Sequence, residues 1–246
     1  MSRRPRLILF DIDGTLLRAR GAGAAAFRRA LASALGRELP EFHVDYAGRT
    51  DLYILTESLR ALGQTLPPTA DLVEQILSLY VSLLPEELER VEEAALCPGV
   101  PEVLEELQSR PDVHLGVLTG NTRAGALTKL RFFEIASYFE VGAYGEATLY
   151  RHELVALAMS AARQHWGLEW RRDDVWLVGD TPHDIDAARR AGVKVAAVAT
   201  GPFPREQLAP LKPDLLLADL TDPGLVTILA GEKGTGRRDD GPADQG

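Results

Sequence analysis

The chain of 246 residues carries 36 Asp and Glu against 27 Lys and Arg, which gives a formal net charge of -9, and 46% of its residues are hydrophobic. At roughly 100–200 residues per domain, this length allows one large domain or two unequal ones, with a sizeable core. The acidic balance argues against a general binder of nucleic acid. The single cysteine, Cys97, excludes an intramolecular disulfide, as is typical of proteins in a reducing compartment.

The N-terminus begins with a basic segment, and the apolar run that follows it stops at Asp11 after residues 7–10. That run is far shorter than the apolar core of about 7–15 residues in a signal peptide, or the about 20 residues of a membrane span. We therefore predict a cytoplasmic protein with no membrane partner. Residues 231–246 are rich in glycine and charge and are expected to form a disordered tail.

Five short apolar runs are continuous rather than alternating, which predicts parallel strands covered on both faces. Helical patterns separate the later runs, as in repeated βαβ units. The predicted fold is α/β, a Rossmann-like doubly wound parallel sheet. The runs are residues 7–10, 115–118, 175–178, 195–198 and 215–217.

Residues 21–96 differ, because their apolar residues recur at helical spacing with no strand-like run between them. Pro40, the Pro67-Pro68 pair and Pro85 are expected to separate the helices, since proline is not tolerated in a helix interior. We predict an all-helical module over residues 18–96. It would be inserted into a core made of residues 1–17 and 97–230.

Two aspartates follow the first predicted strand, in Asp11-Ile12-Asp13-Gly14-Thr15. Ligands of open α/β sheets bind beyond the carboxyl ends of the strands, so both carboxylates are expected at a site. One can attack phosphorus while the other protonates the leaving alkoxide and then activates water. A turn stabilised by aspartate is the structural alternative for Asp13. It does not explain two carboxylates beside a buried strand, where an isolated charge is costly without a partner or metal.

The next predicted strand ends in Thr119-Gly120-Asn121. A hydroxyl beside an unhindered glycine amide, ahead of a helix N-terminus, forms a ready anion site. Asn121 is expected to be the N-cap of that helix. On its own, this short motif is weak evidence for an anion-binding site.

The strand at residues 175–178 is followed by Gly179-Asp180-Thr181-Pro182-His183-Asp184. Thr181 suits an N-cap, Pro182 the first helical position, and Asp184 the first turn, where an acid favours the helix dipole. That pattern explains Asp184 but not Asp180. Mg²⁺ prefers hard oxygen ligands, and a carboxylate from each of two strands is enough to hold it beside a phosphate.

The segments around Asp11, Thr119 and Asp180 resemble, in order and spacing, motifs I, II and IV of the haloacid dehalogenase superfamily of hydrolases. The resemblance covers about residues 6 to 220, and the helical insert is similar to the C1 cap of the phosphoglycolate phosphatase-like members. It implies that Asp11 is the nucleophile and Asp13 the acid/base. It implies phosphoryl contacts from Thr119 and the Gly120 amide, and Asn121 is predicted to bind substrate beside them. Mg²⁺ would be bound by Asp11, the Asp13 carbonyl and Asp180, with Asp184 in the inner or outer shell.

The sequence departs from the family pattern at motif III, where a lysine is usual. The matching stretch, residues 146–154, contains no lysine, and Arg151 is the cation expected to replace it. Lys129 lies well inside the helix after motif II and is predicted to be a surface residue.

Among the activities of the superfamily, the sequence favours a phosphatase acting on a small phosphorylated metabolite. Asp13 argues against a dehalogenase, which needs no acid for its leaving group. The absence of lysine between Leu17 and Cys97 argues against phosphonatase chemistry through a Schiff base. A sugar-phosphate mutase is the alternative enzyme, although Thr15 favours hydrolysis. A noncatalytic phosphate-sensing or partner-binding protein is the alternative of another class, and a receiver domain fits less well.

The helical insert is expected to govern specificity. Gly48-Arg49-Thr50-Asp51 resembles the cap loop that faces the site, so Arg49 could bind a substrate carboxylate or a second phosphate through two hydrogen bonds. A solvated arginine beside the N-cap Thr50 is the structural alternative. No oligomeric state is predicted.

Overall fold

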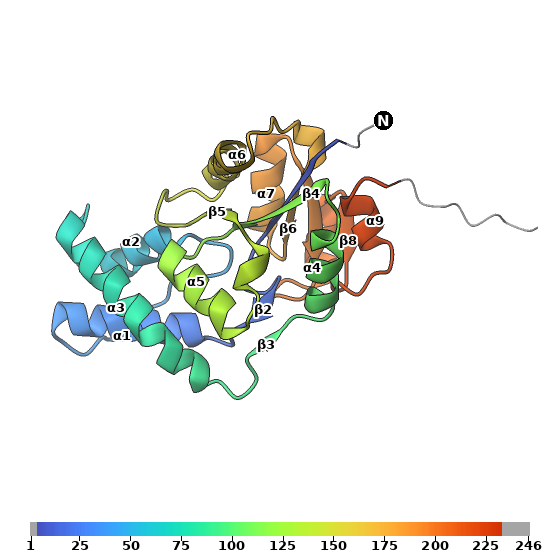
Figure 1. Cartoon of the computed structure of the whole chain (residues 1–246). Helices are drawn as coiled ribbons and strands as arrows, with labels where there is room; N and C mark the ends of the chain where they lie inside the picture. The colour runs from blue at the N-terminus through green and yellow to red at the C-terminus, as the bar shows by residue number, and fades with distance from the viewer. Residues whose placement is uncertain (1–3, 233–246) are drawn as a thin grey trace, which may run out of the picture.

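A computed structural model describes residues 4–232 of the chain (Figure 1). Six parallel strands form one sheet in the order β5-β4-β1-β6-β7-β8. The chain first builds the sheet outward from β1 through β4 to β5, then returns to the other side of β1 and continues through β6, β7 and β8. The strands are β1 (Arg6–Phe10), β4 (Val113–Leu118), β5 (Val141–Ala143), β6 (Val175–Gly179), β7 (Lys194–Val198) and β8 (Leu215–Leu217).

Helices cover both faces of this sheet, which explains why the strands are apolar throughout. In β1, Ile8 and Phe10 pack into one buried cluster and Leu7 and Leu9 into another on the opposite face. The first face is covered by α4 (Val100–Gln108), α5 (Arg123–Phe132) and α9 (Leu225–Leu229), and the second by α6 (Glu153–Trp166), α7 (Pro182–Ala191) and α8 (Arg205–Leu208). Short 3₁₀ turns lie at Ala136–Tyr138, Arg172–Asp174 and Ala209–Leu211. The predicted α/β class with a doubly wound parallel sheet is confirmed.

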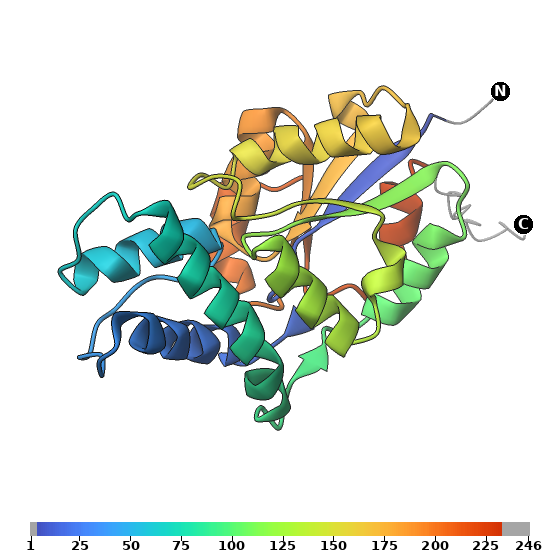
Figure 2. The same ribbon diagram turned by 60° about the vertical axis from the view of Figure 1, so that its left-hand side comes forward.

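The inserted segment forms α1 (Ala22–Leu35), α2 (Asp51–Ala61) and α3 (Ala70–Glu89), which lie together beside the sheet (Figures 1 and 2). We call this module the cap. Its two connections to the core pair as the short antiparallel strands β2 (Leu17–Arg18) and β3 (Ala95–Leu96). The cap shares one continuous apolar cluster with the α4 face of the sheet.

Two details of the elements differ from the sequence-based expectation. Pro85 does not end a helix, because α3 runs through it to Glu89. The buried side chains Tyr80, Leu84 and Leu88 continue one face across the proline, and their packing compensates for the hydrogen bond that it removes. The strand β5 was not predicted. It has three residues with a glycine in the middle, which is too short for a recognisable pattern.

Within residues 4–232, no helix is both long enough and apolar enough to cross a membrane. The predicted disordered tail, 231–246, falls almost wholly outside the described residues.

Candidate active site

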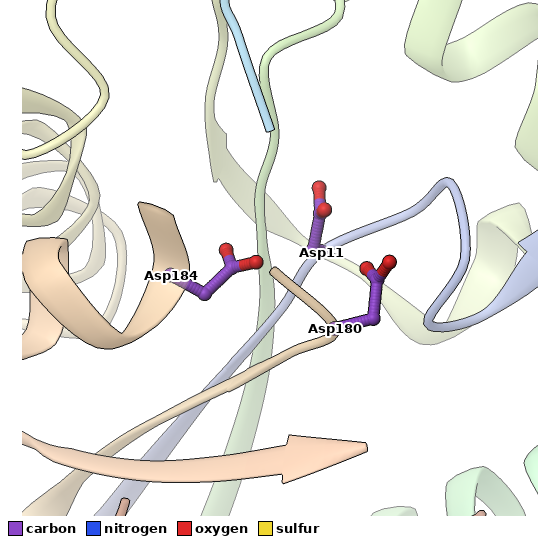
Figure 3. A group of neighbouring side chains, drawn as sticks. All are labelled: Asp11, Asp180 and Asp184. Atoms are coloured by element: carbon purple, nitrogen blue, oxygen red, sulfur yellow. The ribbon is translucent and has the colours of Figure 1, made fainter. Parts of the chain in front are cut away.

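Three buried carboxylates meet at the carboxyl ends of β1 and β6, where the strand order reverses (Figure 3). Asp11 follows β1, Asp180 follows β6, and Asp184 lies in the first turn of α7. One carboxylate oxygen from each residue lies within 4.8 Å of the others. This reversal of strand order is where open α/β sheets bind their ligands.

Arg151 supplies positive charge directly to this cluster. Its Nη2 lies 2.9 Å from Asp11 Oδ2 and 2.6 Å from Asp184 Oδ1, and its Nε donates to the same Asp184 oxygen at 2.9 Å. The Arg151 side chain is only 6% exposed. The structure therefore brings the cation expected at motif III into contact with two of the three carboxylates.

Asp184 has partners on both of its oxygens. Its Oδ2 accepts hydrogen bonds from the backbone N–H and the hydroxyl of Thr181, at 3.0 and 2.7 Å. Thr181 is the N-cap of α7 and forms a capping box with Asp184, with Pro182 in the first turn, as the sequence predicts. Asp184 is thus both a helix-capping residue and part of the cluster.

Asp180 differs because only one of its oxygens has a partner. Oδ1 accepts a hydrogen bond from the Thr15 hydroxyl at 2.9 Å, whereas Oδ2 is buried with no hydrogen-bond partner among residues 4–232. A Cβ at Gly14 or at Gly201 would clash with Oδ2, so both glycines are needed for the backbone to pass this close. Thr15 and Gly201 were not assigned these roles from the sequence.

The cluster fits a divalent cation. Burial raises the pKa of Asp180 well above its ordinary value, and the carboxylates of Asp11 and Asp184 raise it further. Burial likewise raises the pKa of Asp11 to about 6, with the Arg151 guanidinium opposing the rise and Asp184 adding to it. Three buried carboxylates around one arginine, one of them with an oxygen lacking a partner, have the hard donors that Mg²⁺ prefers.

Motif II lies beside this cluster, after β4. The Thr119 side chain is fully buried, and its Oγ1 accepts hydrogen bonds from the Asn121 amide groups, at 3.2 Å from the backbone and 2.8 Å from Nδ2. The expected N-cap at Asn121 is wrong. Thr122 caps α5, accepting from Gly125 N at 3.2 Å, and Asn121 instead turns toward the site. Asparagine and threonine are both good N-caps, so the sequence alone does not decide whether α5 is capped by Asn121 or by Thr122.

Asp13 faces the site from the turn after β1, with a side chain 42% exposed. Its Oδ2 accepts hydrogen bonds from Lys129 Nζ at 2.6 Å and from Asn121 Nδ2 at 2.7 Å. The expectation that Lys129 is a surface residue is therefore wrong, since its side chain is 4% exposed and paired with Asp13. The partners are 116 positions apart in the chain, and nothing in the local sequence of α5 indicates the pairing.

Comparison with known proteins agrees with this arrangement. The sequence profile described as haloacid dehalogenase-like hydrolase matches residues 8–198. The chain belongs to the haloacid dehalogenase-like hydrolase family. It is 31% identical to the phosphoglycolate phosphatase of Synechococcus elongatus over an alignment of 220 residues. This alignment covers 87% of this chain and 93% of the relative. It is 26% identical over 230 residues to pyrophosphatase PpaX of Oceanobacillus iheyensis, covering 91% and 96% of the two chains.

A solved structure from Bacteroides vulgatus, assigned provisionally as a β-phosphoglucomutase, shares the fold with a TM-score of 0.64 and 22% identity. The match covers 94% of this chain and 90% of that one. At 22% identity, this match is evidence for a shared fold and not for a shared activity. The family resemblance, with a phosphoglycolate phosphatase-like relative, is confirmed, as is the expectation of a phosphatase-type hydrolase.

In this haloacid dehalogenase-like hydrolase, the site opens into a cavity of about 670 Å³ between the core and the cap. The core contributes the carboxylates of Asp11, Asp13 and Asp180, and the walls from the cap include Asp51, Phe27, Tyr46 and Tyr80. Arg49 also lines the cavity. Its Nε is buried without a hydrogen-bond partner among the described residues, and its guanidinium lies 4.6 Å from the centre of the Tyr53 ring.

The cap and the core meet closely at the loop before α2. The backbone N–H of Asp51 donates to Gly120 O at 2.6 Å, and Asp51 Oδ2 accepts from the backbone N–H of Thr122 at 2.7 Å. A Cβ at Gly120 would clash with the carbonyl of Arg49. Thr50 caps α2, as predicted, by accepting from Tyr53 N at 3.2 Å. Asp51 was given no role from the sequence, although it joins motif II to the cap.

Burial raises the pKa of Asp51 from its ordinary 3.8 to about 7, although the Thr122 N–H and Lys129 oppose the rise. The folded protein therefore holds this proton more tightly than the unfolded chain, and its free energy of unfolding should fall as pH rises from about 4 to 7. Asp51→Asn, neutral at every pH, should therefore gain stability relative to the wild type by about 2–3 kcal/mol between pH 5 and pH 8, because each unit of pKa shift is worth about 1.4 kcal/mol. That gain is roughly 4–12 °C in Tm for a chain of this size.

Thermal unfolding of both proteins at the two pH values measures this effect. Glu74→Gln, which neutralises an exposed acid of α3 in the same cap, is the matched control and should show no such gain. A difference in Tm between Asp51→Asn and the wild type that is the same at pH 5 and pH 8 would contradict the prediction.

Proposed function

We propose that the protein is a magnesium-dependent phosphatase that hydrolyses a small phosphate monoester through an aspartyl-phosphate on Asp11. The observation that carries this proposal is the cluster of Asp11, Asp180 and Asp184 at the point where the strand order reverses, with Arg151 in contact with Asp11 and Asp184. Asp13 lies two residues from Asp11 in the sequence. The phosphatase and pyrophosphatase names of the relatives support the proposal.

Each residue has a role that its surroundings support. Asp11 attacks phosphorus, and Asp13 protonates the leaving alkoxide and then takes a proton from the attacking water. The Thr119 hydroxyl and the Gly120 amide hold the phosphoryl oxygens at the end of β4. Arg151 provides a fixed positive charge beside the nucleophile, with which it is in contact.

Mg²⁺ would be held by Asp11, the Asp13 carbonyl and Asp180, with Asp184 beside them. When bound, it neutralises phosphoryl charge and orients the ester. Because Asp184 already bonds Arg151 and Thr181, the oxygen best able to accept the ion is the unpartnered Oδ2 of Asp180.

The substrate we propose is phosphoglycolate-like or sugar-phosphate-like. The cavity has room for a small leaving group beyond the phosphoryl site. Arg49 lines it and carries a positive charge that suits an anionic group on the substrate, although its Nε also lies 3.9 Å from Asp45 Oδ2. Asn121 lies within the same walls, but its side-chain atoms already bond Thr119, Asp13 and Lys129. Its contact with substrate stays a prediction.

Hydrolysis of p-nitrophenyl phosphate by the purified protein, with and without Mg²⁺, tests the proposal. Turnover that depends on the metal supports it, and absence of turnover favours the noncatalytic phosphate-sensing alternative. Transfer of the phosphoryl group to a sugar phosphate rather than to water would favour the mutase alternative. A screen of phosphorylated metabolites then identifies the substrate.

Removal of metal by EDTA should abolish turnover, and Asp180→Asn should raise the Mg²⁺ concentration needed for half-maximal rate by about 10-fold or more, by analogy with loss of other metal-site contacts. The effect should exceed that of Asp184→Asn, since Asp180, unlike Asp184, has a buried carboxylate oxygen without a hydrogen-bond partner among the described residues. Asp186→Asn, which changes an exposed aspartate on α7, the helix that also carries Asp184, is the control and should leave the Mg²⁺ requirement unchanged. A rate that EDTA leaves unchanged would refute the metal assignment.

A further inference from the structure

Lys129 is a buried cation that the proposed roles leave unused. It lies on α5, and its Nζ donates to Asp13 Oδ2 at 2.6 Å and to Asn121 Oδ1 at 2.7 Å. Burial of an ammonium group is costly unless charge and hydrogen bonds compensate for it. Here both partners, Asp13 after β1 and Asn121 after β4, belong to the site. The charge of Lys129 is therefore compensated by residues of the site rather than by a structural acid elsewhere.

Asn121 and Lys129 act on the same oxygen of Asp13. Since Lys129 Nζ can only donate, the Asn121 side chain must present Oδ1 to it, which directs Nδ2 toward Asp13 Oδ2 at 2.7 Å. Asp13 Oδ2 therefore accepts two N–H groups. Oδ1 is the oxygen left to exchange a proton with the reacting groups, and the Asp13 side chain lines the cavity.

The cap limits where the lysine head can lie. A Cβ placed at Gly23 of α1 would lie 3.5 Å from Lys129 Nζ and 3.8 Å from the hydroxyl of Tyr80 on α3. The ammonium group thus lies close to α1 and α3 as well as to Asp13 and Asn121. Lys129, Gly23 and Tyr80 all line the cavity, so the lysine head lies at the cavity wall where the cap meets the core.

We propose that Lys129 is a positioning residue for the acid/base Asp13. Together with Asn121 it fixes the carboxyl group and occupies Oδ2, so that Oδ1 carries the proton. The inference rests on the proposed function.

In the first step, Oδ1–H gives its proton to the leaving oxygen as the P–O ester bond breaks and Asp11 bonds phosphorus. In the second, Oδ1 takes a proton from the water whose oxygen bonds phosphorus, while the Asp11–P bond breaks. The ammonium group balances the negative charge that Asp13 carries between these steps.

Lys129→Met tests this role, because it keeps the apolar stem and removes the charged donor. A fixed acid matters most for a poor leaving group, so phenyl phosphate and p-nitrophenyl phosphate are the paired substrates. They have similar shape, but p-nitrophenolate leaves readily without a proton. We expect kcat/KM to fall about 10-fold or more further for phenyl phosphate than for p-nitrophenyl phosphate, since general acid catalysis contributes typically 10²–10⁴-fold.

Two further variants make the result specific. Lys129→Arg keeps the charge and should recover part of the loss on phenyl phosphate. Asn121→Ala removes the second donor to Oδ2 and should show the same bias toward the better leaving group. Should Lys129→Met fail to fold, judged by circular dichroism, these two variants decide the outcome. Arg131→Met, an exposed cation on the same helix, is the matched control and should leave both rates unchanged.

Equal losses on both esters, or no loss, in Lys129→Met and Asn121→Ala would overturn the inference. A different result would refute the proposed function itself. In that case the wild-type protein turns over neither ester with Mg²⁺, or Asp11→Asn keeps its activity. A protein that is active, requires Asp11 and treats the two esters alike after loss of Lys129 refutes the positioning role alone.

Discussion

Asp11→Asn is expected to abolish turnover, by on the order of 10⁴-fold or more in kcat, because an amide cannot act as the nucleophile and no other described carboxylate follows β1 in the same position. The fold should persist. Asparagine has the shape of aspartate, and it removes a charge from a site where burial raises the pKa of Asp11 to about 6.

The sign of the stability effect follows from that pKa. The folded protein holds the Asp11 proton more tightly than the unfolded chain, whose pKa is near 3.8, so the carboxylate lowers the free energy of unfolding as pH rises from about 4 to 6. Metal-free Asp11→Asn should therefore be no less stable than the wild type at pH 8. This separates loss of chemistry from loss of fold.

A second measurement follows the intermediate itself. Wild-type protein quenched during turnover of a substrate with labelled phosphate should retain label, and Asp11→Asn should retain none. Asp186→Asn, an exposed aspartate paired with Arg190, is the control and should keep both the rate and the label. Near-normal turnover in Asp11→Asn would rule out the covalent mechanism.

The sequence predicts the parts of this molecule that depend on local pattern. Buried parallel strands appear as continuous apolar runs, and the five predicted runs all lie in strands of the sheet. Capping at Thr181 follows from residue type and spacing. The sequence also predicts that Asp11 and Asp180 lie at one site, because the carboxyl ends of parallel strands share one edge of a sheet.

The contacts that the sequence did not predict join segments far apart in the chain. Lys129 looks like an ordinary polar residue of α5, and only the packing of the cap and the core places its Nζ on Asp13. Asp51 appears as the first residue of a capped helix, yet its carboxylate accepts a hydrogen bond from the backbone N–H of Thr122 in the core. Local propensity carries no information about such partners, because tertiary packing determines them.

Arg151→Ala is expected to lower kcat by about 10²-fold or more, by analogy with the removal of one preorganised donor. The phosphoryl group and Asp11 bring several negative charges together, and one divalent ion neutralises only part of them. The structure shows Arg151 in contact with Asp11 Oδ2 at 2.9 Å, so its charge acts on the nucleophile itself. It also makes two hydrogen bonds to Asp184 Oδ1.

The same contacts predict a cost in stability. Removal of one partner from a buried ion pair typically costs about 3–5 kcal/mol, because the remaining charges stay buried without compensation. Metal-free Arg151→Ala should therefore unfold at a lower temperature, and added Mg²⁺ should restore part of the loss by binding the buried carboxylates that have lost Arg151. Thermal unfolding with and without Mg²⁺ measures both effects.

Arg151→Lys separates the charge from its geometry. Lysine is a point charge, whereas the guanidinium presents several donors in one plane and here contacts two carboxylates at once. We expect Arg151→Lys to recover most of the stability and only part of kcat. Wild-type kcat in Arg151→Ala would mean that the reaction needs no fixed cation beside Asp11. Equal recovery of stability and rate in Arg151→Lys would mean that charge alone is sufficient and that the contact with both carboxylates is not needed.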